Sequence, residues 1–217
     1  MTANSSGNCY LCGVKLAKTA MGTHLFKLHE VGKGGQECCL LKIEGAYDKS
    51  YWLYIDIPVG KTLSEVDKFL RKIWLECCGH MSEFLDSGRN EIGMSRKLGG
   101  FSAGDKILHV YDFGDTTETI ITVMGSTWRE PQKNTVRLLA RNVPPVFNCT
   151  DCGKAAEYTY AMYTGPSEDV YYCVECADEK EDAEMLLPVT NSPRMGVCGY
   201  DGELDTFEFK PVPRVAD

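Results

Sequence analysis

Eleven of the 217 residues are cysteines, and six of them form three Cys-x2-Cys pairs. In the C-terminal third, two such pairs are separated by 20 residues and comprise Cys149, Cys152, Cys173 and Cys176. Each pair can direct two thiolates at one ion, and four thiolates form the tetrahedral sulfur site that Zn²⁺ accepts readily. We therefore predict a structural zinc ion here, in a β-rich zinc ribbon. A redox pair and inert thiols are the alternatives.

The remaining pair is followed by two histidines, in the order Cys9-x2-Cys12-x11-His24-x4-His29. This pattern resembles a Cys2His2 zinc finger, although the central spacer has 11 residues rather than 12. We predict a second structural zinc ion, and the alternative is a stray cysteine pair with two exposed histidines. Four protein ligands would leave neither zinc ion an open position for a substrate.

The predicted finger is poorly suited to sequence-specific DNA recognition. The stretch before its first histidine, residues 17–23, contains one lysine and no arginine, asparagine or glutamine, and one finger covers only about 3 base pairs. Lys15, Lys18 and Lys27 would allow weak contact with a nucleic-acid backbone.

Charge is distributed unevenly along the chain. The net charge is −8, but residues 149–217 hold 15 acidic and only five basic side chains. A basic footprint for nucleic acid over the whole protein is therefore excluded. The acidic run at residues 178–184 is typical of a solvated helix face.

The elements that must position these residues follow from hydrophobic patterns. We predict an α+β fold: a small mixed, largely antiparallel sheet with one main helix, in the order ββα followed by further strands. The helix begins at Leu63 behind a Thr62–Glu65 capping box and ends near Gly79. The strands are predicted at residues 39–43, 51–57, 106–111, 119–124 and 135–140.

Composition divides the chain into three predicted domains. Residues 1–35 are the Cys2His2-like zinc finger, which ends in a glycine-rich linker. Residues 37–146 are the α/β core domain. Residues 147–217 follow a Pro-Pro break and hold the four-cysteine zinc ribbon, an acidic helix and a C-terminal extension.

The central segment contains recognisable motifs: Tyr-Trp-Leu at residues 51–53, His-x-x-Glu-Phe at 80–84 and Tyr-Asp-Phe-Gly-Asp at 111–115. Over roughly residues 37–125 the chain resembles the Ri-plasmid open-reading-frame-three-like family, whose members also occur as passengers of insertion elements. It looks closest to an archaeal subgroup with an added zinc finger and zinc ribbon. The family generally has a Trp shortly after the Asp-Phe-Gly-Asp turn, where this chain has Thr-Thr-Glu at 116–118. The resemblance implies a fold and no established activity.

Two groups of residues remain open to more than one interpretation. Asp112 and Asp115 fit a structural role, accepting backbone N–H bonds in a hairpin turn. Alternatively, they could meet His80 and Glu83 in a cleft that binds a metal or performs acid–base chemistry. The five leftover cysteines are by default core residues, with a third metal site, or a thiol switch that pairs Cys39 with Cys77 or Cys78, as alternatives. These five are Cys38, Cys39, Cys77, Cys78 and Cys198.

Both predicted sites have closed coordination, and no nucleophile–base set accompanies them. We therefore expect a non-enzymatic zinc-binding recognition protein, with two structural Zn²⁺ ions, that contacts a protein or ribonucleoprotein partner. The competing hypothesis is an enzyme: a metal-dependent hydrolase near His80, Asp112 and Asp115, or a thiol redox protein that uses the Cys-Cys pairs. The chain has no long apolar run and no secretory signal at its start, so we expect it in the cytoplasm and away from membranes.

Overall fold

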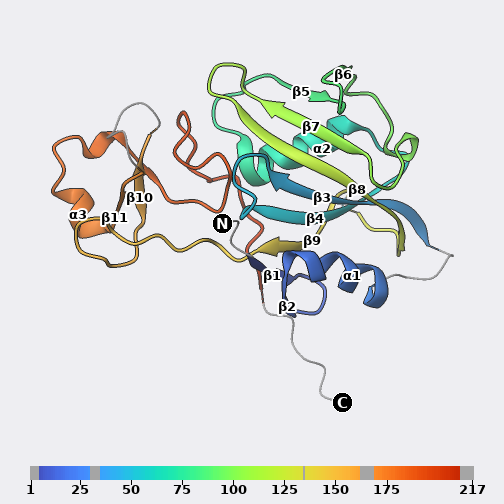
Figure 1. Cartoon of the computed structure of the whole chain (residues 1–217), viewed down its shortest axis with the longest axis horizontal. Coiled ribbons are helices and arrows are strands. Elements are labelled where there is room, and N and C mark those ends of the chain that lie inside the picture. The colour runs from blue at the N-terminus through green and yellow to red at the C-terminus, as the bar shows by residue number, and fades with distance from the viewer. Residues whose placement is uncertain (1–4, 30–34, 134, 162–168, 211–217) are drawn as a thin grey trace, which may run out of the picture.

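A nine-stranded sheet forms the body of the protein (Figure 1). The computed structural model describes residues 5–29, 35–133, 135–161 and 169–210. The strands lie in the order β2-β1-β9-β4-β3-β8-β7-β5-β6, and every neighbouring pair is antiparallel. Their bounds are β1 Ser6–Cys9, β2 Lys15–Ala17, β3 Gln36–Gly45, β4 Trp52–Pro58, β5 Ser82–Leu85, β6 Glu91–Ile92, β7 Lys106–Tyr111, β8 Thr117–Arg129 and β9 Arg137–Asn142. The predicted mixed fold with a largely antiparallel sheet is confirmed, but the sheet is larger than the small one expected, and the predicted ββα arrangement is not confirmed.

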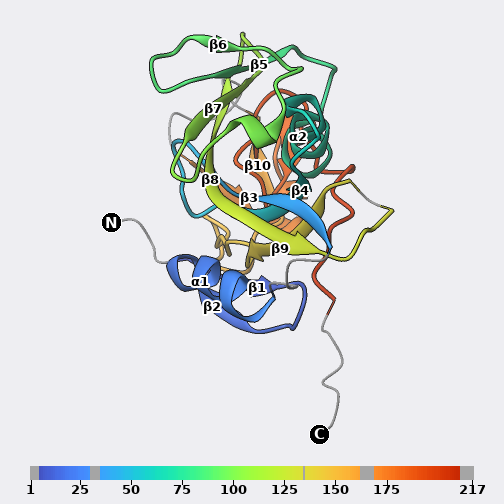
Figure 2. The same ribbon diagram turned by 90° about the vertical axis from the view of Figure 1, so that its right-hand side faces the viewer.

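Strand β4 is buried along its whole length because both faces of the sheet are covered there. On one face, Leu53, Ile55 and Ile57 pack with α2 (Leu63–Leu70) in the main core. On the other, Trp52 and Tyr54 pack against α1 (Lys18–Leu28) in a second core. Figure 2 shows the two helices on opposite sides of the central strands. Burial on both faces explains why residues 51–57 are almost continuously apolar or aromatic.

The main helix differs from the prediction in two respects. Thr62 is the N-cap, as expected, but its side chain makes no cap hydrogen bond, and Glu65 pairs with Lys68 instead. The α-helical part spans only eight residues and continues as a π-helical turn, η1 (Arg71–Leu75). The wider turn lets Ile73, Trp74 and Leu75 all be buried. The expectation of a single main helix is not confirmed, because α1, with 11 residues, is longer than α2.

The N-terminal segment is part of the main sheet. β1 pairs with β9 through Gly7↔Asn142 and Cys9↔Ala140, and β2 pairs with β1 on its other side. Gly7 is required by a close approach, since a Cβ there would lie 2.3 Å from the carbonyl oxygen of Arg141. The predicted finger therefore continues the core sheet instead of standing apart from it.

Residues 147–161 and 169–188 form a separate lobe with its own three-stranded sheet, in the order β11-β10-β12 (Figure 1, left). Its elements are β10 Tyr158–Tyr160, β11 Tyr171–Tyr172, α3 Val174–Asp178, the 3-10 helix η3 Ala183–Met185 and β12 Leu186–Pro188. A further 3-10 helix, η2 Leu98–Gly100, belongs to the main body. The acidic run at 178–184 is largely exposed, as expected, but it is not a helix face, because α3 ends at Asp178 and a turn follows.

After β12 the chain returns to the main body and runs along it (Figure 1). Ser192 donates a 2.6 Å hydrogen bond from its hydroxyl to the carbonyl oxygen of Trp74. Farther on, the ring of Phe207 packs edge-on against Phe69, and its carbonyl oxygen accepts a hydrogen bond from the Tyr10 hydroxyl. The C-terminal segment, residues 190–209, thus holds the lobe to the sheet at several points. No helix in the described parts of the chain is both long and apolar enough to cross a bilayer.

A buried ion-pair network joins three strands of the main sheet. Asp56 on β4 is fully buried and accepts hydrogen bonds from Arg129 on β8, at 2.6 Å, and from Arg137 on β9, at 3.0 Å. Removing the carboxylate would break a fully buried ion pair with the Arg129 guanidinium, which is far costlier than losing a surface pair.

We expect Asp56→Ala to lower the free energy of unfolding by about 3–5 kcal/mol. The measurement is urea unfolding in zinc-saturated buffer, so that metal loading is equal for all variants. Glu91→Ala, at an exposed position of the edge strand β6, is the control and should change stability by less than about 0.5 kcal/mol. A loss below about 1 kcal/mol for Asp56→Ala would contradict the assigned role.

Candidate metal centres

The finger residues converge on one point. Cys9 ends β1, Cys12 lies in the following turn, His24 is on α1 and His29 comes directly after that helix. The Cys9 Sγ atom lies 3.5 Å from His29 Nε2, Cys12 Sγ lies 3.3 Å from His24 Nε2, and the two Nε2 atoms are 3.1 Å apart. A tetrahedral zinc ion with bonds of about 2.0–2.3 Å separates its ligands by roughly 3.3–3.8 Å. The two sulfur–nitrogen distances fall in this range and the nitrogen–nitrogen distance is about 0.2 Å shorter, so the four atoms are compatible with such an ion.

Burial shifts the pKa values of the two finger histidines in the direction that favours metal binding. It lowers the pKa of His24 and of His29, which favours the neutral imidazole. Neutral imidazole is the form that coordinates a metal. Burial also raises the pKa of the Cys9 thiol, so a bound cation would have to displace that proton.

The ribbon cysteines also converge. Cys149 and Cys152 flank a tight turn, and Cys173 and Cys176 lie at the start of α3. All four sulfur atoms lie within 4.8 Å of one another, and Cys152 Sγ is 3.6 Å from Cys173 Sγ. Burial acts to raise the pKa of Cys149, but backbone N–H groups, first that of Cys173, outweigh it and lower the value to about 6. This thiol is therefore readily available as a thiolate.

The first Cys-x2-Cys turn in each cluster has the same backbone geometry. The N–H of Cys9 donates to the carbonyl of Val14 at 2.9 Å, and the N–H of Gly13 donates to the carbonyl of Cys9 at 2.8 Å. The bonds from Cys149 to Lys154 and from Gly153 to Cys149 repeat this pattern at 2.7 and 2.8 Å. Both glycines have positive φ, 77° and 74°, which an L side chain rarely adopts. The two turns present their sulfur pairs in the same way.

A third cluster gathers residues whose roles the sequence left open. Cys77, Cys78 and His80 lie in the loop between η1 and β5, and Cys198 reaches them from the C-terminal segment. Cys198 Sγ lies 3.7 Å from Cys78 Sγ and 3.6 Å from His80 Nε2. A Cys-Cys-x-His run was a usable signal, but nothing in the sequence pointed to Cys198, which lies 118 residues beyond His80, as the fourth member.

The Asp112 side chain has a structural role. Its Oδ1 accepts the N–H of Gly114 at 3.0 Å, and its Oδ2 accepts a 2.7 Å bond from the fully buried Arg194. Burial acts to raise the pKa of this carboxyl, but Arg194 chiefly outweighs it and lowers the value. His80 Nε2 lies 3.4 Å from Oδ2, whereas Asp115 contributes only its carbonyl oxygen to the contact with Arg194. Glu83 is on β5 and outside the cluster that His80 joins.

The other leftover cysteines, Cys38 and Cys39, lie on β3 and are buried. Burial raises the pKa of both thiols, to about 11 for Cys39. Such thiols are poor nucleophiles, and their position agrees with core packing. Neither belongs to the cluster that contains Cys77 and Cys78.

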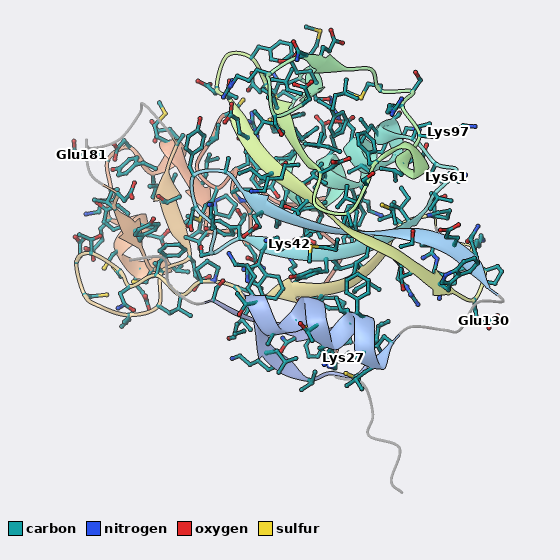
Figure 3. All side chains as sticks on the ribbon, turned by 45° about the vertical axis from the view of Figure 1, so that its right-hand side comes forward. Lys27, Lys42, Lys61, Lys97, Glu130 and Glu181 are labelled. Carbon is teal, nitrogen blue, oxygen red and sulfur yellow. The ribbon has the colours of Figure 1, made fainter. Side chains whose placement is uncertain are left out.

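One of the three lysines proposed for weak nucleic-acid contact is occupied within the protein. Lys18 donates to the Glu44 carboxylate at 2.7 Å and to the carbonyl oxygen of Lys49 at 2.9 Å. Lys15 and Lys27 remain exposed, and Figure 3 shows Lys27 on the outer side of α1. The finger is therefore less basic at its surface than the sequence suggests.

Comparison with known proteins adds little. No family model and no curated protein matches the sequence. Among solved structures, the fold is similar to the crystal structure of a protein of unknown function, MM3350, from Methanosarcina mazei Go1. The identity is 18%, the match covers 55% of this chain and 76% of that one, and the TM-score is 0.43.

The finger and the ribbon should respond differently to loss of metal. The ribbon's buried core consists of Cys149, Tyr172, Cys173 and Ala177, of which two are candidate ligands. The finger instead shares a core with the main sheet, through residues such as Met21 and Trp52. Without metal the ribbon loses much of what holds it together, while α1 keeps its packing.

We expect a strong zinc chelator to abolish hydrogen-exchange protection throughout residues 147–161 and 169–188 while β3, β4 and β8 stay protected. Loss of protection in α1 should be smaller and confined to its C-terminal turn, next to His29. Mass-spectrometric hydrogen exchange with and without chelator tests this, and added Zn²⁺ should restore the signal. An unchanged ribbon would show that it folds without metal.

Proposed function

We propose that this chain is a non-enzymatic zinc-binding protein that recognises a protein or ribonucleoprotein partner. One observation carries the proposal: in the finger and in the ribbon, four protein side chains lie close enough together to supply all the positions of a tetrahedral ion. A zinc ion closed in this way can stabilise a fold but has no position for substrate or water. The two Zn²⁺ ions would thus stabilise the folded finger and ribbon, and with them the surfaces that contact a partner.

We also propose that the protein works in the cytoplasm and belongs to the family that its central motifs resemble. All eleven cysteines lie within the described residues and are unpaired, which suits a reducing compartment. The family proposal rests on the motifs at residues 51–53, 80–84 and 111–115.

The ribbon lobe offers the more distinctive recognition surface. Asp178, Glu179, Glu181 and Glu184 are accessible on it, and Figure 3 shows Glu181 at the end of the lobe that faces away from the sheet. An acidic face attracts a basic protein surface and repels phosphate. In a ribonucleoprotein it would therefore contact the protein component, while Lys15 and Lys27 of the finger could approach the nucleic-acid backbone.

The geometry at Asp112 gives the hydrolase hypothesis less support than the recognition hypothesis. Both carboxylate oxygens are engaged, one with the Gly114 N–H and the other with Arg194. A hydrolase would need an open carboxylate there to hold an ion or activate water. The thiols beside it, Cys77 and Cys78, gather with His80 at metal-ligand spacing, which favours a structural use over redox chemistry.

The test is a charge reversal on the ribbon, Glu179→Lys with Glu181→Lys, followed by crosslinking in the native cells and quantitative mass spectrometry of captured proteins. The matched control is Glu91→Lys with Glu130→Lys, which makes the same change in net charge at exposed positions of the main body. Point substitutions are preferable to deletion of the finger, because deletion would remove β1 and β2 from the sheet.

We expect the ribbon variant to lose at least about tenfold of the specific capture, equivalent to about 1.4 kcal/mol, with zinc content unchanged. The control should capture the same proteins at the wild-type level. If the ribbon variant and the control captured the partner equally well, the acidic surface would not be the recognition surface.

A further inference from the structure

A group of thiols and one imidazole lies at the junction between the main body and the C-terminal segment. We propose that Cys77, Cys78, His80 and Cys198 bind a third zinc ion, which fastens the C-terminal segment to the core. The four ligand atoms lie within 4.8 Å of one another, as in the finger and the ribbon. This site does not depend on the proposed partner.

The distances favour a shared metal ion over a disulfide at this cluster. The Sγ atoms of Cys78 and Cys198 are 3.7 Å apart, which is close to a ligand–ligand edge around Zn²⁺ and far longer than the roughly 2.05 Å of a disulfide. His80 Nε2 lies 3.6 Å from Cys198 Sγ, again a tetrahedral edge. Three sulfurs and one nitrogen form a donor set that Zn²⁺ accepts as Cys3His.

The backbone is shaped to bring the last ligand into place. Cys198 has φ of 55°, one of only three positive values among the described non-glycine residues, and Asp112 beside the cluster has another. Gly79, between Cys78 and His80, has φ of 75°. Left-handed backbone at a non-glycine residue costs free energy and persists where neighbouring interactions require it. Coordination of Cys198 would supply that requirement.

A buried arginine donates a hydrogen bond to one of the ligands. Binding of Zn²⁺ would release three thiol protons to solvent and leave a site with net charge −1. The Arg194 guanidinium, which is fully buried, lies 3.4 Å from Cys77 Sγ and donates to Asp112 Oδ2 at 2.7 Å. It also packs over the ring of Tyr111, 4.8 Å from its centre. A donor fixed in this way stabilises a metal-bound thiolate and holds its orientation.

The site would anchor the segment that connects the ribbon to the body. Cys198 and Arg194 belong to that segment, whereas Cys77, Cys78 and His80 follow η1 in the core. Ser192, in the same segment, is bonded to Trp74 of η1. An ion here would clamp the two stretches together, as a disulfide does in an oxidising compartment.

Exposure sets this site apart from the other two. Each cluster has one exposed cysteine, but Cys9 of the finger and Cys149 and Cys173 of the ribbon are buried, whereas no ligand of the third site is buried. A zinc ion without a buried ligand is the most accessible to chelators. The third ion should therefore leave first, releasing the C-terminal segment while the finger and the ribbon keep theirs.

The experiment counts zinc in the full chain, purified without chelators, by elemental analysis against protein concentration. We expect three equivalents for the wild type, two for Cys198→Ser and three for His80→Cys, which replaces one ligand with another. Met81→Ala, at an exposed neighbour that offers no ligand, is the matched control and should keep three. Hydrogen exchange should rise at residues 190–205 in Cys198→Ser and remain unchanged in His80→Cys.

Two equivalents in the wild type, with no fall in Cys198→Ser, would overturn the third site and leave the finger and ribbon proposals intact. Zero or one would overturn the proposed function as well. A Cys78–Cys198 disulfide, detected by mass spectrometry under non-reducing conditions in freshly purified protein, would replace the metal clamp with a redox pair. If Cys198→Ser fails to fold, titration of the metal-free wild type with Co²⁺ still decides, since its absorbance should saturate at three equivalents and not at two.

Discussion

At three places in the described parts of this protein, cysteine sulfur and histidine nitrogen atoms that could bind a metal lie within 4.8 Å of one another. Thiolates at such separations repel each other unless a cation lies between them, and as neutral thiols they would gain little from the arrangement. The backbone is bent to produce this crowding, through the positive φ of Gly13 and Gly153 in two clusters and of Cys198 in the third. In the ribbon, whose described residues include few buried ones, a bound cation would hold together what packing alone secures weakly.

The three clusters differ in how much packing supports them. The finger shares a core with the main sheet, because β1 pairs with β9 and α1 covers Trp52 and Tyr54. Among its described residues the ribbon has few that are buried, and half of those in its buried core are candidate ligands. The third cluster lies on the surface, next to the buried Arg194. Dependence on metal should therefore be greatest in the ribbon, and accessibility of the metal greatest at the third site.

Electrostatics divides the molecule in a similar way. Inside the main body, buried arginines form ion pairs with buried carboxylates: Arg129 with Asp56, and Arg194 with Asp112. On the ribbon the acidic side chains around Glu181 remain accessible to a partner. The body is thus internally neutralised, whereas the lobe carries a net charge that acts outward. The proposed recognition role rests on this outward acidic face together with the two four-ligand clusters.

Local patterns in the sequence determined a good part of this structure. Each predicted strand of the main sheet is found, because strands such as β4 and β7 have strong apolar patterns that tertiary packing does not override. The finger and ribbon residues were identifiable because Cys-x2-Cys spacing is a local property of a tight turn. The start of α2 at Leu63 was predictable from a local pattern in the same way. Its early end and its continuation as a π-helical turn, in which Trp74 and its neighbours are buried, were not.

Long-range contacts decided the rest. Pairing of β1 with β9 makes the finger an edge of the sheet, and no short sequence pattern encodes a pairing such as Cys9 with Ala140, so far apart in the chain. The same is true of Cys198, which reaches Cys78 and His80 only because the C-terminal segment folds back along the body. Sequence spacing reveals ligands that share a turn, since the turn itself brings them together. Ligands that meet across the fold are identified only when the packing that joins them is known.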